Sequence, residues 1–179
     1  NKQFQLAKKI DSKLWMANAI SSIGVVNYIK GNYSEAIKNQ NQSLKWNNEI
    51  NNINGQISAY GNLSIIYARQ GIYDRAIFYN MECLRLQENI GDSSGMALTL
   101  LNTGNFYQFQ NSYEEAIDKY DKAIVLAEKT NNKRALGIIY LNYGALCLSL
   151  KDHNRAIKFI KKGLRIREEF NDLISIEKT

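Results

Sequence analysis

One column of polar side chains recurs at a fixed interval along the sequence. Ser22, Asn62, Asn102 and Asn142 lie forty residues apart. An asparagine amide both donates and accepts hydrogen bonds, so it can pair with an N–H and a C=O group of a peptide backbone. If helical layers lie about 10 Å apart and each presents one amide, the amides would contact about every third residue of an extended segment. Such amides should lack partners within the protein, whereas amides that only brace adjacent helices would be paired internally.

The chain offers few residues for catalysis or metal binding. His153 is the only histidine, and Cys83 and Cys147 are the only cysteines. These three cannot make an ordinary zinc site, and both cysteines fall at apolar positions, which indicates core residues rather than a disulfide. The sequence has no glycine-rich phosphate loop and no nucleophile–base pair. We therefore expect no enzymatic activity, no catalytic residues, no metal site and no cofactor.

Positive charge is concentrated near the end of the sequence. Residues 151–167 hold seven lysines and arginines against one acid, Asp152. One helical face would carry four of them: Arg155, Lys158, Lys162 and Arg165. This face could dock an acidic partner, nucleic acid or anionic lipid, but a solvated outer face is the favoured interpretation. Because no aromatic residues are interleaved as in a nucleic-acid groove, we expect no nucleic-acid partner.

The elements that position these residues repeat every forty residues. Four Ala-Ile pairs lie in register, and they begin at Ala36, Ala76, Ala116 and Ala156. Self-similarity at this period indicates an array in which each repeat packs on its neighbours. Apolar residues recur at spacings of three and four over two stretches in each repeat, which predicts two helices. We expect the alanines to be buried where these helices cross.

Polar turns separate the expected helices. Gly31, Gly71 and Asn111 suit the left-handed backbone that ends a helix. Proline is absent from the sequence, so the helices can run without interruption. We expect eight full helices in antiparallel pairs, with breaks near residues 31–33, 51–54, 71–73, 91–94, 111–113, 131–133, 151–153 and 171–172.

The periodicity divides the chain into four complete repeats with incomplete ends. The repeats are expected at residues 13–54, 55–94, 95–134 and 135–172. Residues 1–12 would form the second helix of a preceding repeat, and residues 173–179 would start a following helix. Because neither end shows a polar capping helix, we expect a piece of a longer protein. The uncovered apolar ends would allow end-to-end self-association.

The repeated columns resemble the tetratricopeptide pattern W-x2-L-G-x2-Y…A-x3-F…P. In the third repeat the matching residues are Leu100, Thr103, Gly104, Tyr107, Ala116, Tyr120 and Ala123. The period is forty rather than 34, and the proline column holds Asn48, Glu88, Glu128 and Glu168. These residues let the second helix continue where proline would end it. The long-repeat form resembles kinesin light chain, LGN-type arrays and bacterial Rap-type regulators.

This resemblance implies an all-α fold, a right-handed α-solenoid of tetratricopeptide helix-turn-helix repeats. In the resembling families, the first helix of each repeat lines a concave groove that binds proteins or peptides. The ligand-binding groove positions implied here are Asn62, Asn102, Asn142, Asn105, Arg69, Ser22, Gln108 and Phe109. A clamp for a terminal carboxylate uses several cations in this groove, and Arg69 with Asn105 does not supply them.

The sequence therefore predicts a protein- or peptide-binding scaffold within a larger signalling or regulatory protein. One alternative is a peptide-responsive sensor that switches an attached kinase-like or DNA-binding domain, and another is a purely structural spacer or self-assembly segment. We expect an extended protein segment as the partner and no small-molecule substrate. No apolar run reaches the roughly 18 residues of a membrane span. A cytoplasmic location is expected, while a periplasmic or extracytoplasmic one stays open.

Overall fold

The computed structural model describes residues 12–176, and from residue 170 onward it describes the backbone alone. Within this range the chain forms eight helices and no strand, which confirms the all-α prediction. The helices are α2 (Lys13–Ile29), α3 (Tyr33–Glu49), α4 (Ile53–Arg69), α5 (Tyr73–Asn89), α6 (Ser93–Phe109), α7 (Tyr113–Lys129), α8 (Lys133–Ser149) and α9 (His153–Ile176). None of these described helices is long and apolar enough to cross a membrane.

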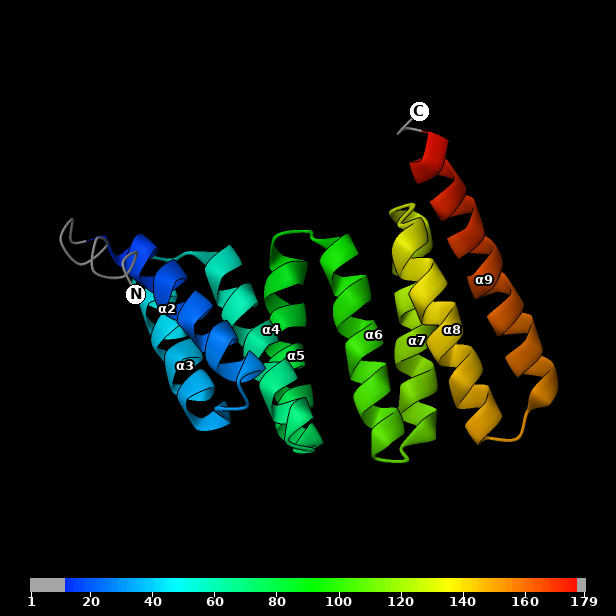
Figure 1. Cartoon of the computed structure of the whole chain (residues 1–179), viewed down its shortest axis with the longest axis horizontal. Helices are drawn as coiled ribbons and strands as arrows, with labels where there is room; N and C mark the ends of the chain where they lie inside the picture. The colour runs from blue at the N-terminus through cyan, green and yellow to red at the C-terminus, as the bar shows by residue number, and fades with distance from the viewer. Residues whose placement is uncertain (1–11, 177–179) are drawn as a thin grey trace. The chain divides into compact units, whose positions relative to one another are not determined.

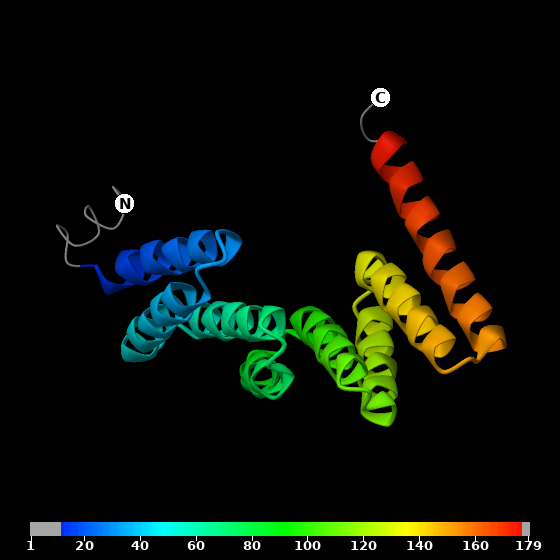
Figure 2. The same cartoon turned by 60° about the horizontal axis from the view of Figure 1, so that its bottom comes forward.

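The chain divides into two compact units, which are described separately. Unit 1 comprises Asn1–Asn89 and contains α2 to α5, whereas unit 2 comprises Ile90–Thr179 and contains α6 to α9. In each unit every helix packs on the next one, and the two first helices, α2 with α4 and α6 with α8, also touch. Figures 1 and 2 show the two helices of each pair running in opposite directions. Each unit is therefore two helix-turn-helix repeats packed together.

Each turn between these helices places one residue in left-handed backbone, at intervals of twenty residues. Positive φ angles between 50° and 79° occur at Gly31, Asn51, Gly71, Gly91, Asn111, Asn131 and Lys151. Glycine and asparagine adopt this conformation most easily, and six of the seven positions hold one of them. The side chains of Asn52, Asp92 and Asn132 then cap the next helix by accepting a backbone N–H bond. The left-handed residues predicted at Gly31, Gly71 and Asn111 are confirmed.

Small residues let the two helices of each repeat approach closely. The four alanines of the Ala-Ile pairs are fully buried, as predicted: Ala36, Ala76, Ala116 and Ala156. At Gly104, a Cβ atom would lie 3.3 Å from the carbonyl oxygen of Ala116 and 2.7 Å from the ring of Tyr120. The crossing of α6 and α7 therefore has no room for a larger side chain.

The last helix corrects one predicted boundary. α9 runs without a break from His153 to Ile176 (Figure 1), so the break expected at 171–172 and the new helix expected from residue 173 are wrong. Asparagine and aspartate are only moderately unfavourable inside a helix, so these residues permit α9 to continue. The other seven breaks lie where the sequence predicts them. Residues 1–11 of the expected preceding helix, and residues 177–179, lie outside the described residues.

Candidate functional site

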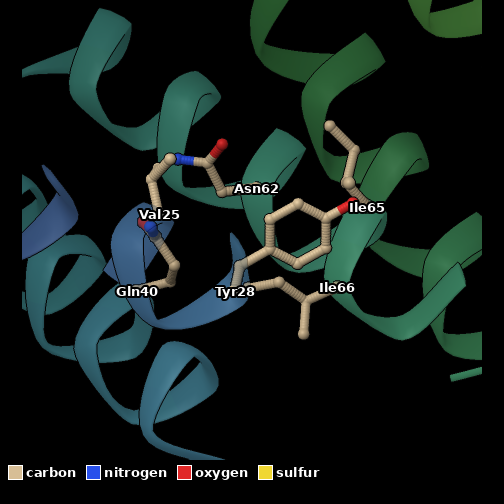
Figure 3. Close-up of a pocket in the computed structure, with 6 residues that line it drawn as sticks. All are labelled: Val25, Tyr28, Gln40, Asn62, Ile65 and Ile66. Carbon is tan, nitrogen blue, oxygen red and sulfur yellow. The ribbon is translucent and has the colours of Figure 1, made fainter. Parts of the chain in front are cut away.

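A small cavity opens between α2, α3 and α4 of unit 1. Its volume is about 190 Å³, and it is lined by Val25, Tyr28, Gln40, Asn62, Ile65 and Ile66. Figure 3 shows the Tyr28 ring in the middle, with Asn62 on one side and the two isoleucines on the other. Val25 and Ile65 are 37% and 43% exposed, so the cavity is open to solvent. Its lining is mostly apolar, with two amides as the polar groups besides the Tyr28 hydroxyl.

The two amides that line the cavity differ in their hydrogen bonding. Gln40 is fully buried, and both ends of its amide bond to Ser21: Nε2 donates to the backbone oxygen at 3.0 Å, and Oε1 accepts from the hydroxyl at 3.1 Å. Asn62 is half-buried, and its side chain makes no hydrogen bond with any residue that the structure describes. The hydrogen-bonding capacity of Asn62 is therefore available to a ligand.

Unit 2 holds the equivalent residues eighty positions later, and there the polar groups bond to one another. The equivalents of the six cavity residues are Asn105, Gln108, Tyr120, Asn142, Ala145 and Leu146. Asn142 Nδ2 donates to Asn105 Oδ1 at 3.0 Å. The hydroxyl of the fully buried Tyr120 lies 2.7 Å from Asn105 Oδ1 and 2.9 Å from Gln108 Oε1, and it donates its single proton to one of them. We call these four polar residues the Tyr120 network.

One sequence difference explains why Asn62 is unpaired and Asn142 is paired. Unit 1 has Val25 where unit 2 has Asn105, so Asn62 lacks the partner that Asn142 uses. The expectation that the groove amides lack internal partners is therefore wrong for Asn142. Unit 1 also has Gln40 where unit 2 has the larger Tyr120, whose ring packs beside the first helices. Asn102 is half-buried and makes no side-chain hydrogen bond within the described part of the chain.

The remaining predicted groove residues are not part of either cluster. The Ser22 hydroxyl donates to the backbone oxygen of Asn18 in its own helix at 3.0 Å. Arg69 is exposed in the last turn of α4 and forms no ion pair with a described residue. Phe109 is 62% exposed at the end of α6. The structure thus brings together Asn105, Gln108 and Asn142 in unit 2, and it places Asn62 beside the unit 1 cavity.

Two basic residues of α9 pack on aromatic rings of α8. Arg155 donates to the Tyr143 hydroxyl at 2.9 Å, and its guanidinium lies 5.6 Å from the centre of that ring. The Lys162 ammonium lies 5.1 Å from the centre of the Tyr140 ring. Arg165 pairs with Glu169 at 3.1 Å, and Lys158 is exposed. Two of the four cations thus pack on aromatic rings of α8, and Lys158 and Arg165 lie on the exposed surface of α9.

Tyr120 and Tyr143 are buried in the interior of unit 2. Tyr143 is 1% exposed, and its ring stacks on Phe159 with centres 4.2 Å apart. Burial raises the pKa of Tyr143 to about 12, the Asp121 carboxylate adds to this effect, and the Arg155 guanidinium opposes it. Burial also raises the pKa of Tyr120. Ionising either hydroxyl would place a negative charge in the packed interior.

The free energy of unfolding should therefore fall as the pH rises from about 10 toward 12. An unfolded tyrosine loses its proton near pH 10, whereas folded Tyr143 holds its proton to about pH 12. The unfolded state binds fewer protons in this range, so the stabilisation is complete below pH 10 and is lost above it. Urea denaturation at several pH values checks this, and Tyr143→Phe should show a shallower decline. Equal slopes for the two proteins would contradict the assignment.

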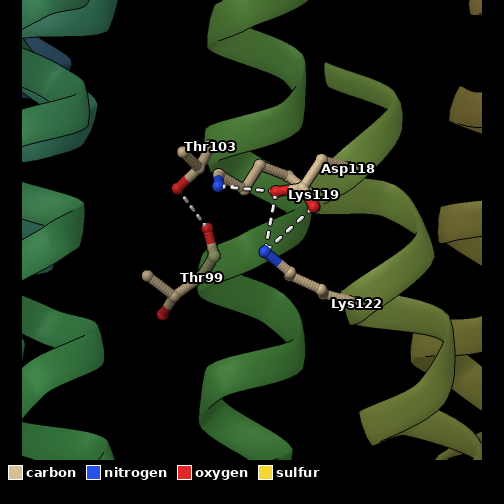
Figure 4. Close-up of polar contacts among 5 residues, drawn as sticks. All are labelled: Thr99, Thr103, Asp118, Lys119 and Lys122. Carbon is tan, nitrogen blue, oxygen red and sulfur yellow. Dashed lines mark hydrogen bonds and ion pairs between the residues drawn. The ribbon is translucent and has the colours of Figure 1, made fainter. Parts of the chain in front are cut away.

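A cluster of ion pairs lies within α7 and has no arrangement suited to catalysis. Lys119 and Lys122 both contact the Asp118 carboxylate, at 2.8 Å and 2.9 Å. Hydrogen bonds from these two ammonium groups hold the pKa of Asp118 below its ordinary value. Figure 4 shows them beside α6, where the Thr103 hydroxyl donates to the backbone oxygen of Thr99 at 2.8 Å. Exposed pairs of this kind contribute little to stability, and no group of three metal-binding side chains occurs among the described residues.

Sequence reasoning missed the polar interior of unit 1. Gln40, Ser43 and Asn47 are all buried on α3. The Ser43 hydroxyl donates to the backbone oxygen of Ala17 at 2.9 Å, and Asn47 Oδ1 accepts from Asn52 at 2.8 Å. The aligned repeats already show this difference in sequence, because the positions equivalent to these three in unit 2 hold Tyr120, Ala123 and Ala127. A comparison between repeats, rather than within one repeat, would have marked unit 1 as the atypical half.

Comparison with known proteins identifies the sequence pattern. Residues 15–89 and 95–169 match the sequence model of the family described as Tetratricopeptide repeat. Together the two matches cover well over half of the chain. No curated protein matches the chain in sequence.

Three solved structures have a similar fold at low sequence identity. BtubC (BKLC) from P. vanneervenii is 19% identical with a TM-score of 0.81, over 94% of this chain and 69% of that chain. Aspartyl phosphate phosphatase F from Bacillus subtilis is 19% identical with a TM-score of 0.83, over 93% and 44%. A Signal Transduction ATPase with Numerous Domains (STAND) protein with a tetratricopeptide repeat sensor, from Pyrococcus horikoshii, is 20% identical with a TM-score of 0.81, over 94% and 27%. This chain thus spans less than half of the last two proteins.

Proposed function

Because the chain belongs to the tetratricopeptide repeat family, we propose that it binds an extended segment of another protein on its first helices. The observation that carries this proposal is the unpaired Asn62 amide beside the unit 1 cavity. At about 190 Å³ the cavity is smaller than the 300–1,000 Å³ typical of small-molecule pockets. It is larger than an engineered cavity of about 150 Å³ that holds benzene. One side chain of a protein segment fits this size.

The Asn62 amide and the cavity are suited to act on neighbouring residues of the same segment. The amide can pair with the N–H and C=O groups of an extended backbone, which is independent of the ligand's sequence. Side chains of an extended segment alternate in direction. A residue beside the one held by Asn62 can therefore direct its side chain into the cavity while its neighbours face solvent. Binding of this kind needs no catalytic group, and we propose a non-enzymatic interaction module.

A sensor within a larger regulatory protein is the second candidate. The STAND protein of similar fold carries a tetratricopeptide repeat sensor, and this chain spans 27% of it. An array of the same fold could report on a bound segment to an attached kinase-like or DNA-binding domain. The two cysteines, Cys83 and Cys147, are free and buried. That state agrees with a cytoplasmic location, which we include in the proposal.

Replacing Asn62 with alanine should weaken peptide binding by roughly threefold to tenfold. This corresponds to the net value of about one hydrogen bond. The melting temperature should stay the same, because the amide has no partner among the described residues. Peptides selected on the wild-type chain from a phage-displayed random library supply the probe, and fluorescence anisotropy measures their dissociation constants. Asn48→Ala is the matched control, because Asn48 is an exposed amide on a second helix, α3.

Two results would overturn the proposal in different ways. If the library yields no peptide that binds the chain, the spacer interpretation replaces the binding module. If Asn62→Ala lowers the melting temperature and leaves the dissociation constants unchanged, Asn62 is a structural residue and the binding surface lies elsewhere.

A further inference from the structure

The first helices of the repeats carry no acidic residue. None of the 17 aspartates and glutamates in the chain lies within α2, α4, α6 or α8. In unit 1, the cations on these helices are Lys13 and Arg69. Lys13 forms an ion pair with Glu49 of α3 at 3.0 Å. Among the residues that the structure describes, no charged side chain lines the cavity, so the wall beside Asn62 is neutral.

From this neutrality we infer the ligand's chemistry: the unit 1 cavity takes one apolar side chain of an uncharged protein segment, which is recognised without ion pairs. The inference rests on the proposed function and adds the class of segment that is bound. Two apolar residues that line the cavity are well exposed, Val25 at 37% and Ile65 at 43%. Covering them removes apolar surface from water, which is the largest favourable contribution available at this site.

Charged segments do not match the same surface. A lysine or arginine placed here would lose water without a carboxylate on the first helices to replace it. An acidic segment would find only Arg69 as an unpaired cation on α2 and α4 among the described residues, and one exposed ion pair adds little affinity. Selection against charge therefore accompanies the preference for an apolar side chain.

Unit 2 shows which side chains would close the unit 1 cavity. At the equivalent positions, Asn105 replaces Val25 and Tyr120 replaces Gln40, and the Tyr120 network pairs Asn142 internally. Copying these residues into unit 1 gives the double variant Val25→Asn/Gln40→Tyr. Gly24 lies beside Gln40 as Gly104 lies beside Tyr120, so the tyrosine ring has the same small neighbour in both units. The variant should pair Asn62 and fill the cavity.

The test uses peptides that a random phage library yields on the wild-type chain. We expect them to share one apolar residue among uncharged neighbours, and changing that residue to alanine should weaken binding about tenfold or more. The double variant should lose a similar factor. Val25→Phe should also weaken binding about tenfold. Because Val25 is partly exposed, this variant should fold even if the double variant does not, so the test stays valid. Val125→Phe, on the exposed face of α7, is the control that should bind normally.

Salt dependence separates this mode from charge recognition. Affinity should change by less than about twofold between about 50 mM and about 500 mM salt, because no ion pair is screened. Selected peptides with a conserved lysine, arginine, aspartate or glutamate, or with affinity that falls steeply with salt, would overturn the inference while peptide binding stands. Equal binding by wild type and Val25→Phe would also overturn it. A library that yields no binding peptide would remove the proposed function itself.

Discussion

Replacing Tyr120 with alanine should lower the free energy of unfolding by about 3–5 kcal/mol, the range for large aromatic residues removed from a core. Tyr120 is fully buried between α6 and α7, and its ring centre lies 5.5 Å from that of Tyr143. The change removes this packing together with the hydroxyl that contacts Asn105 and Gln108. Urea denaturation followed by circular dichroism measures the effect.

The conservative variant separates packing from hydrogen bonding at this position. Tyr120→Phe keeps the ring and removes the hydroxyl, so it should cost about 0.5–1.5 kcal/mol. Tyr113→Phe is its control, because the one side chain that the Tyr113 hydroxyl bonds to within the described range is the exposed Asn111, at 2.7 Å. If Tyr120→Ala lost no more stability than Tyr120→Phe, the ring would not be the core element that its burial indicates.

Enlarging Ala116 to leucine should destabilise the fold by about 1–3 kcal/mol through overpacking. Ala116 is fully buried, and its carbonyl oxygen lies at the crossing where Gly104 brings α6 close to α7. A leucine side chain would have to push the two helices apart. A thermal melt compares it with Val125→Leu, a change on the same helix at a position that is 63% exposed. If the Ala116→Leu variant had the same melting temperature as the parent chain, the crossing of α6 and α7 would have room for a larger side chain.

The repeat pattern was sufficient to predict most of the fold. Helix ends are local events, set by left-handed residues such as Gly31 and Asn111 and by caps such as Asp92, and these recur in the sequence. The burial of the repeated alanines could also be predicted from the repeat pattern, because only a small side chain fits where the two helices of a repeat cross. The prediction of a break at 171–172 was wrong because the polar residues there permit a turn without requiring one. The helix continues to Ile176.

The candidate site was predicted less completely, because pairing depends on neighbours from other repeats. The column of Asn62, Asn102 and Asn142 is uniform in sequence, yet Asn142 is paired and Asn62 is not. The difference arises from Val25 and Asn105, which belong to a different helix from the asparagine that each one faces. The cavity likewise depends on Gln40, which lies on a second helix that the groove prediction did not consider. Predicting such contacts requires the three-dimensional packing of the repeats, because the aligned repeat positions alone do not show which side chains meet.

NMR of a library-selected peptide bound to the chain tests the central claim most directly. If the first helices bind the segment, the side-chain amide signals of Asn62 and the methyl signals of Val25 and Ile65 should shift on titration. The competing surface is the outer face of α5, where Phe78 and Met81 are 57% and 49% exposed. Shifts of Asn62, Val25 and Ile65 that saturate with the measured affinity are the predicted result. Shifts confined to Phe78 and Met81, with Asn62 unchanged, would contradict the account.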